Sequence, residues 1–254
     1  MRLISLARVA LAVGFAILGV LSLRYRDFAL NWQPVPDGVP LRMVLACASG
    51  ALLVAGGIGL LVPRFARRAA VVMTLFVGSW LVLLQVPRVV AQPGQAYIWL
   101  GFAENLLLVT GAWVLCLELA GTGGPAKRSL LLGDGALRAA RLLYGVALPL
   151  IGLSHFVYAD ATAAMVPAWL PERRAFAYLT GIGHIAAGLG ILFGMVPRLA
   201  ATLEAAMISA FVLLLHLPGV VAAPADRLQW TMLGIALAYS GAAWSVAASY
   251  SKKG

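Results

Sequence analysis

Long apolar runs separated by short polar segments dominate this chain. A helix that crosses a bilayer needs about 20 mostly apolar residues. Eight runs meet this requirement, at 4–23, 41–62, 68–90, 97–119, 137–157, 174–196, 199–217 and 228–248. The first run follows Arg2 as a signal peptide would, but no suitable cleavage site follows Leu23, so we interpret it as a retained span. The predicted fold class is an all-α integral membrane protein with eight transmembrane helices.

The two halves of the chain match each other without gaps from Pro36 to Trp113 when one is shifted by 131 residues. Residues with special roles recur at this offset, including the pairs Pro36 and Pro167, Gly57 and Gly188, Pro87 and Pro218, Trp99 and Trp230, and Trp113 and Trp244. Each half holds four spans, an even number, so we predict two parallel four-helix-bundle repeats related by an axis along the membrane normal. The predicted repeats cover 1–119 and 137–254, and a glycine-rich cytoplasmic linker at 120–136 joins them.

Composition and charge support a membrane protein. Apolar residues make up 62% of the chain and charged residues 11%, against about a quarter charged in a soluble domain. The net charge of +10 is spread between the apolar runs, so lipid headgroups rather than nucleic acid are the expected partners. Twelve of the nineteen basic residues fall on one side, which predicts a bacterial-type inner (plasma) membrane protein with both termini cytoplasmic. Cys47 and Cys116 fall near opposite faces and should not pair.

Five ionisable side chains lie within the predicted spans, where an ionisable group costs several kcal/mol. His184 shares a helix face with Gly181 and Gly188, so it should point into the bundle, as a partner in an interhelical hydrogen bond, as a ligand or quinone contact, or as a metal ligand. His155 and His216 lie near the outer ends of their spans at similar depth. They are either structural or contacts for a shared ligand, haem or metal.

The remaining candidates lie at both ends of the spans. Glu104 is expected to point inward, either as a protonated carboxyl that donates a hydrogen bond or as a proton relay or ligand. Glu204 is expected near the cytoplasmic surface, paired with an arginine such as Arg198. Trp169 lies in a proline-flanked outer loop that either anchors the bundle or covers a pocket, and Tyr178 would supply an aromatic wall.

The second half carries a recognisable string of motifs: GLSHF at 152–156, MVPAWLP at 165–171, YLTGIGHI at 178–185 and LHLP at 215–218. It resembles the DoxX and DoxX-like family of small four-span membrane proteins. This chain differs in carrying two fused copies, and its first copy has Arg24, Leu53 and Gln85 opposite His155, His184 and His216. The resemblance implies a membrane-embedded component, in some members part of quinone-linked sulfur oxidation or redox-stress complexes.

These observations favour a membrane subunit or small enzyme that handles quinone or a related apolar ligand at the periplasmic side of the second repeat. The predicted ligand-binding residues are His155, His184, His216, Tyr178, Trp169 and Glu104. A quinone head group needs hydrogen-bonding groups for its oxygens and an apolar route, and histidine exchanges protons near neutral pH. Quinone is the one cofactor suggested, and redox subunits of an oxidoreductase are the expected protein partners. A non-catalytic scaffold or assembly factor and a small-molecule transporter are the alternatives.

Overall fold

The computed structural model describes residues 2–30, 32–120 and 133–251. Its elements in chain order are α1 (Arg2–Tyr25), α2 (Arg42–Leu61), α3 (Pro63–Trp80), η1 (Leu81–Gln85), α4 (Val86–Ala91), α5 (Ala96–Ala120), α6 (Asp134–Val157), α7 (Ala159–Met165), α8 (Arg173–Leu192), α9 (Pro197–Phe211), η3 (Val212–His216), α10 (Leu217–Ala222) and α11 (Arg227–Ser249). No strand occurs in these described ranges. Eight helical spans are long and apolar enough to cross a membrane, and each boundary lies within five residues of its predicted position. The all-α prediction is confirmed.

The third and seventh spans each consist of two α-helical segments joined by a π-helical turn. In the third span η1 lies between α3 and α4, and in the seventh η3 lies between α9 and α10. Each π turn is followed at the second position of the next segment by a proline, Pro87 or Pro218. Proline lacks a backbone N–H, and its ring crowds the carbonyl four residues earlier, so a wider turn ahead of it relieves the contact. The helix therefore continues past the proline, and the seventh span extends beyond its predicted end.

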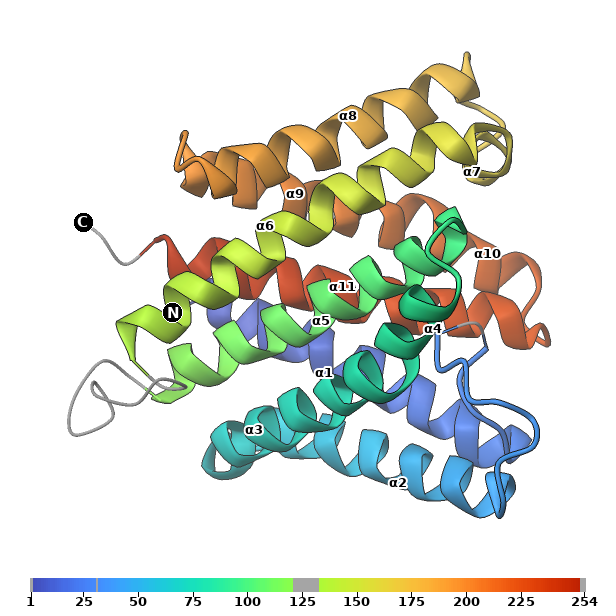
Figure 1. The fold of residues 1–254 in the computed structure, drawn as a ribbon. Helices are drawn as coiled ribbons and strands as arrows, with labels where there is room; N and C mark the ends of the chain where they lie inside the picture. The colour runs from blue at the N-terminus through green and yellow to red at the C-terminus, as the bar shows by residue number, and fades with distance from the viewer. Residues whose placement is uncertain (1, 31, 121–132, 252–254) are drawn as a thin grey trace.

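The bounds of three elements recur at the offset found in the sequence. The bounds of α2, η1 and α4 plus 131 give those of α8, η3 and α10. The packing nevertheless differs from two self-contained four-helix bundles. The first helix of each half packs on the second helix of its own half and also along the last helix of the other half, α1 on α11 and α6 on α5, and α5 also packs on α11. Figure 1 shows α1, α5 and α11 together in the middle of the molecule.

Glycines explain the close packing of α1 on α11. A Cβ added to Gly14 would lie 2.6 Å from the carbonyl oxygen of Gly234, and one added to Gly241 would lie 2.5 Å from the backbone nitrogen of Leu11. Small residues let helix backbones approach this closely. The corresponding positions of α5, 131 residues earlier, hold Ala103 and Thr110. The packing of α1, from the first half, on α11, from the second half, thus depends on small residues in both helices.

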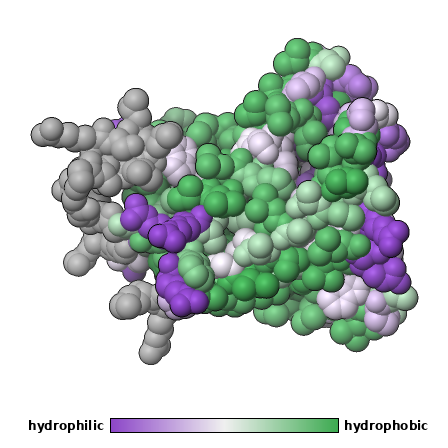
Figure 2. Space-filling model, turned by 90° about the horizontal axis from the view of Figure 1, so that it is seen from below, coloured by the Kyte–Doolittle hydropathy of each residue, from purple (hydrophilic) through white to green (hydrophobic). Residues whose placement is uncertain are grey.

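Apolar side chains cover much of the outer surface. Figure 2 shows a broad hydrophobic face between two ends at which hydrophilic residues gather. Large apolar side chains on this outer surface, such as Leu75, Val90 and Phe193, are about seven-tenths exposed. Exposed apolar area of this extent is unfavourable in water, and lipid removes the penalty.

Two smaller predictions concern the cysteines and the linker. Cys47 and Cys116 are free, as expected. The predicted linker at 120–136 falls mainly on 121–132, outside the described residues, and α6 begins within it at Asp134. The start of α1 and the end of α11 lie at the same end of the molecule (Figure 1).

Candidate ligand-binding site

A cavity of about 470 Å³ lies among α5, α6, α8, α9, η3 and α11, with α7 and the loop after it along one side. This volume is within the usual range of small-molecule sites, about 300–1,000 Å³. Four predicted site residues line it: Glu104, His155, His184 and His216. Most of the remaining wall is apolar or aromatic, with Leu100, Leu107, Ile151, Phe176, Met207, Phe211, Leu214, Met232 and Ile235 among the lining residues.

His155, in the last turn of α6, and His184, in the middle of α8, lie against each other. Their ring centroids are 5.1 Å apart and the ring planes meet at 69°. His155 Nδ1 is 2.9 Å from the hydroxyl oxygen of Thr180 and 3.3 Å from the carbonyl oxygen of Ala177. A carbonyl only accepts hydrogen bonds, so this geometry favours a proton on Nδ1 and leaves Nε2 as an acceptor.

His184 is hydrogen-bonded to Glu204, which the sequence analysis predicted near the cytoplasmic surface. Its Nδ1 is 2.8 Å from Glu204 Oε1, and the two side chains are 4% and 0% exposed. The expected pairing of Glu204 with Arg198 is therefore wrong, since Arg198 is exposed at the start of α9. The hairpin between α8 and α9 turns at Gly194, which has a φ of 68°. His184 and Glu204 are each ten residues from Gly194, so antiparallel packing places them at one level, a signal that the sequence did contain.

Glu104 lines the opposite wall from α5 and has a partner that the sequence did not suggest. Its carboxyl is hydrogen-bonded to the hydroxyl of Tyr239 on α11. The same hydroxyl accepts a hydrogen bond of 2.9 Å from Trp32 Nε1. Trp32 is buried in the loop after α1, 207 positions before Tyr239. No local pattern links residues so far apart in the chain.

His216 is the last residue of η3 and is buried against the cavity. Its place depends on the π turn, because a π-helical turn rotates the following residues relative to a regular α-helix. Phe211, immediately before η3, lies with its ring centroid 6.1 Å from that of His184. The seventh span therefore contributes both an imidazole and an aromatic wall to the same space.

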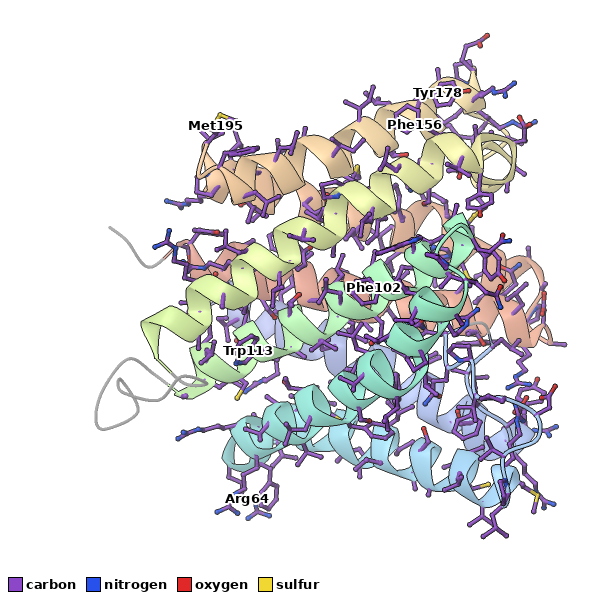
Figure 3. The ribbon with its side chains drawn as sticks, in the orientation of Figure 1. Arg64, Phe102, Trp113, Phe156, Tyr178 and Met195 are labelled. Atoms are coloured by element: carbon purple, nitrogen blue, oxygen red, sulfur yellow. The ribbon has the colours of Figure 1, made fainter. Side chains whose placement is uncertain are left out.

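Two predicted site residues lie outside the cavity. The ring of Tyr178 stacks on Phe156 with centroids 5.4 Å apart, and its hydroxyl accepts a hydrogen bond from Arg174 Nε. Figure 3 shows Tyr178 and Phe156 together at the periphery of the fold. Trp169 is 70% exposed. Its neighbours Pro167 and Leu170 do line the cavity, so the outer loop contributes through different side chains than expected.

None of the three histidine positions has a histidine as its counterpart in the first half, and the structure changes one of the assigned pairs. A Cβ on Gly50 would lie 2.9 Å from Ser22 Cβ, and one on Gly181 would lie 2.9 Å from His155 Cβ. Ser22, rather than Arg24, is therefore the structural counterpart of His155. The offset is 133 in the first helix and 131 in the second, because Ser22 and Gly50 are 28 positions apart and His155 and Gly181 are 26 positions apart.

The polar pair behind the cavity is replaced by an apolar pair in the first half. Leu53 and Met73 stand 131 positions before His184 and Glu204, and both are fully buried. Trp32 packs edge-on against Trp80, the counterpart of Phe211, with centroids 5.1 Å apart. In the first half the Trp32 indole therefore lies against Trp80, whose counterpart in the second half, Phe211, borders the cavity.

Comparisons with known proteins point to the same half. The sequence model of a family described as Domain of unknown function (DUF8561) matches residues 144–247. This range contains His155, His184, Glu204 and His216. No curated protein and no solved structure matches the chain. Among the described residues, no group of three or more His, Cys, Asp or Glu side chains is placed to hold a metal ion.

Proposed function

We propose that this chain is a DoxX-like, multi-pass protein of a bacterial-type inner membrane that binds a quinone or a related apolar ligand in the cavity of its second half. In this proposal two parallel four-span repeats interlock, and both termini are cytoplasmic. Eight apolar helices, an apolar outer surface and element bounds that recur at a fixed offset support this architecture. Parallel repeats follow from the even number of spans in each half.

One observation carries the ligand assignment: three imidazoles and a carboxyl from different helices line a single, otherwise apolar cavity. Ionisable groups at membrane depth are costly, and their convergence on a hollow is typical of a functional site. The walls suit an apolar ring, and the imidazole nitrogens suit its oxygens.

The hydrogen bonds within the protein indicate what each imidazole does. His155 Nδ1 is occupied by Thr180 and Ala177, and His184 Nδ1 by Glu204, so the Nε2 atoms are left for a ligand. A neutral Nε2 accepts a hydrogen bond from a quinol hydroxyl, and a protonated one donates to a quinone carbonyl. Both rings can therefore bind the head group and exchange protons with it. Redox partner subunits would supply or remove the electrons.

Quinone binding by histidine variants tests the proposal. The protein is reconstituted in nanodiscs and titrated with a short-chain ubiquinone analogue. His155→Ala and His184→Ala should each weaken binding about tenfold, the effect of losing one hydrogen bond of about 1.4 kcal/mol. Ser22→Ala and Gln85→Ala, at the counterparts of His155 and His216, should leave binding unchanged. If the histidine variants bind the analogue as well as the parent does, the quinone assignment is wrong and a scaffold role is favoured.

A second candidate, a small-molecule transporter, is favoured by the cavity position of Glu104 and its hydrogen bond to Tyr239. A carboxyl at this depth could couple proton movement to that of a solute. This function predicts uptake into proteoliposomes that depends on pH and is abolished by Glu104→Gln. Uptake that is flat across pH would contradict it.

A further inference from the structure

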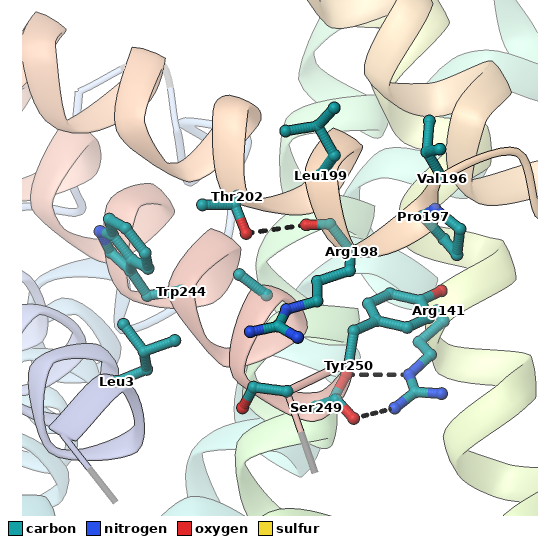
Figure 4. Close-up of a pocket in the computed structure, with 12 residues that line it drawn as sticks. Leu3, Arg141, Val196, Pro197, Arg198, Leu199, Thr202, Trp244, Ser249 and Tyr250 are labelled. Carbon is teal, nitrogen blue, oxygen red and sulfur yellow. Dashed lines mark hydrogen bonds between the residues drawn. The ribbon is translucent and has the colours of Figure 1, made fainter. Parts of the chain in front are cut away.

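A second pocket, of about 860 Å³, lies at the opposite end of the molecule from the outer loops, where α1 begins and α11 ends. Its walls come from the start of α1, the first turns of α6, the α8–α9 turn and the end of α11. Arg141 and Arg198 both line it, and Figure 4 shows them on either side of Tyr250, with Arg198 extending toward Trp244. None of these residues borders the histidine cavity.

The two arginines are held differently. Arg141 Nε donates a hydrogen bond of 2.8 Å to the hydroxyl of Ser249, Arg141 also donates to the Ser249 carbonyl, and its guanidinium lies 4.0 Å from the centroid of the Tyr250 ring. Glu118 also interacts electrostatically with Arg141. The Arg198 guanidinium has no hydrogen bond or ion pair with any residue that the structure describes. Arg141 is thus an anchored cation and Arg198 an available one.

The surroundings of these cations are apolar. Leu3, Val196 and Leu199 line the same pocket, and Val196 and Leu199 are 68% and 54% exposed. Thr202 adds a hydroxyl whose hydrogen is donated to the Arg198 carbonyl. A pocket that combines guanidinium groups with exposed apolar side chains matches a phosphate group joined to acyl chains.

We infer that this pocket binds the phosphate group of an anionic phospholipid. Guanidinium groups bind phosphate oxygens through paired N–H donors. The pocket lies on the predicted cytoplasmic side, where anionic lipid headgroups and basic residues meet. The inference is independent of the proposed quinone site.

Lipid binding by matched arginine variants tests the inference. The purified protein is titrated in detergent with phosphatidylglycerol, phosphatidylcholine or inorganic phosphate, and bound lipid is counted by native mass spectrometry. Phosphatidylglycerol should bind about tenfold more tightly than phosphatidylcholine, and Arg198→Gln should remove that preference. Arg67→Gln is the control, because Arg67 stands 131 positions before Arg198, is exposed and does not line the pocket.

Three results would overturn the inference. Equal binding of the two lipids by the parent protein would show that the headgroup charge is not recognised. Equal losses in Arg198→Gln and Arg67→Gln would show a general effect of surface charge. Displacement of phosphatidylglycerol by millimolar inorganic phosphate would show that the site holds the free ion rather than a lipid. Because Arg198 is exposed and its side chain has no hydrogen bond or ion pair within the described ranges, its replacement should not impair folding, which a matched thermal unfolding curve checks.

Discussion

Replacing Glu204 with leucine should destabilise the fold, because it leaves the buried His184 without its hydrogen-bond partner. The bond between His184 Nδ1 and Glu204 Oε1 is 2.8 Å long, and both side chains are almost fully buried. Leaving a buried polar group unsatisfied costs about 1–3 kcal/mol, while interhelical hydrogen bonds in membrane proteins average about 0.6 and reach about 1.7 kcal/mol. The imidazole also borders a cavity that can admit water. We therefore expect Glu204→Leu to lower the free energy of unfolding by about 1–2 kcal/mol.

The first half supplies the natural control for this pair. It holds Leu53 and Met73 at the corresponding positions, so two apolar side chains can pack there. The double variant His184→Leu/Glu204→Leu should therefore be more stable than the sum of its single variants implies. Leucine is preferred to methionine at position 204. A Cβ on Gly56 would lie 2.0 Å from Met73 Sδ, and the counterpart of Gly56 is Ala187, which has such a Cβ.

The assay is a double-mutant cycle on the purified protein. Unfolding of the parent, both single variants and the double variant is followed by circular dichroism in mixed micelles with increasing dodecyl sulfate. A coupling energy between about 0.5 and 2 kcal/mol is expected for two residues in direct contact. If the effects of the single variants simply add, to within about 0.5 kcal/mol, the buried pair is not an energetic unit and the reasoning fails.

Three further outcomes are expected. Burial acts to raise the pKa of Asp27, but hydrogen bonds from two arginines and a backbone amide hold this pKa below its ordinary value. The resulting stability is present above about pH 4 and is lost as the pH falls through the folded-state pKa, so acid unfolding of Asp27→Asn should lack this component. Gly241→Ala places a Cβ 2.5 Å from the backbone of α1 and should lower the free energy of unfolding by about 1–3 kcal/mol, as measured by thermal unfolding. Gly94→Ala is the control and should cost far less, because nothing lies within 4 Å of its added Cβ. Equal costs would refute close α1–α11 packing. In spheroplasts that express a variant without its native cysteines, a membrane-impermeant maleimide should label Tyr178→Cys directly and Arg64→Cys only after lysis. The two residues lie at opposite ends of the molecule (Figure 3). The reverse labelling pattern would contradict the predicted orientation.

The sequence by itself predicted the all-helical class, the eight apolar spans and the recurrence at a fixed offset. Hydropathy is a local property, and a span of about 20 apolar residues satisfies its own backbone hydrogen bonds, so it can be located without knowing its neighbours. The same reasoning selected His155, His184, His216 and Glu104, because ionisable residues are rare within such spans. All four line the cavity.

The tertiary structure decided which side chains line the cavity and most of the contacts that they make. Tyr178 and Tyr239 are both tyrosines on helices, but only Tyr239 of the two lines the cavity, because this depends on how each helix is rotated about its axis. Trp169, in the loop after α7, is 70% exposed. The hydrogen bonds from Trp32 through Tyr239 to Glu104 join three segments from both halves of the chain. A side chain's direction is fixed by the packing of its helix against others, and a π turn or a two-residue change in a loop shifts that direction without changing hydropathy. Local patterns therefore located the helices, and contacts between helices built the cavity.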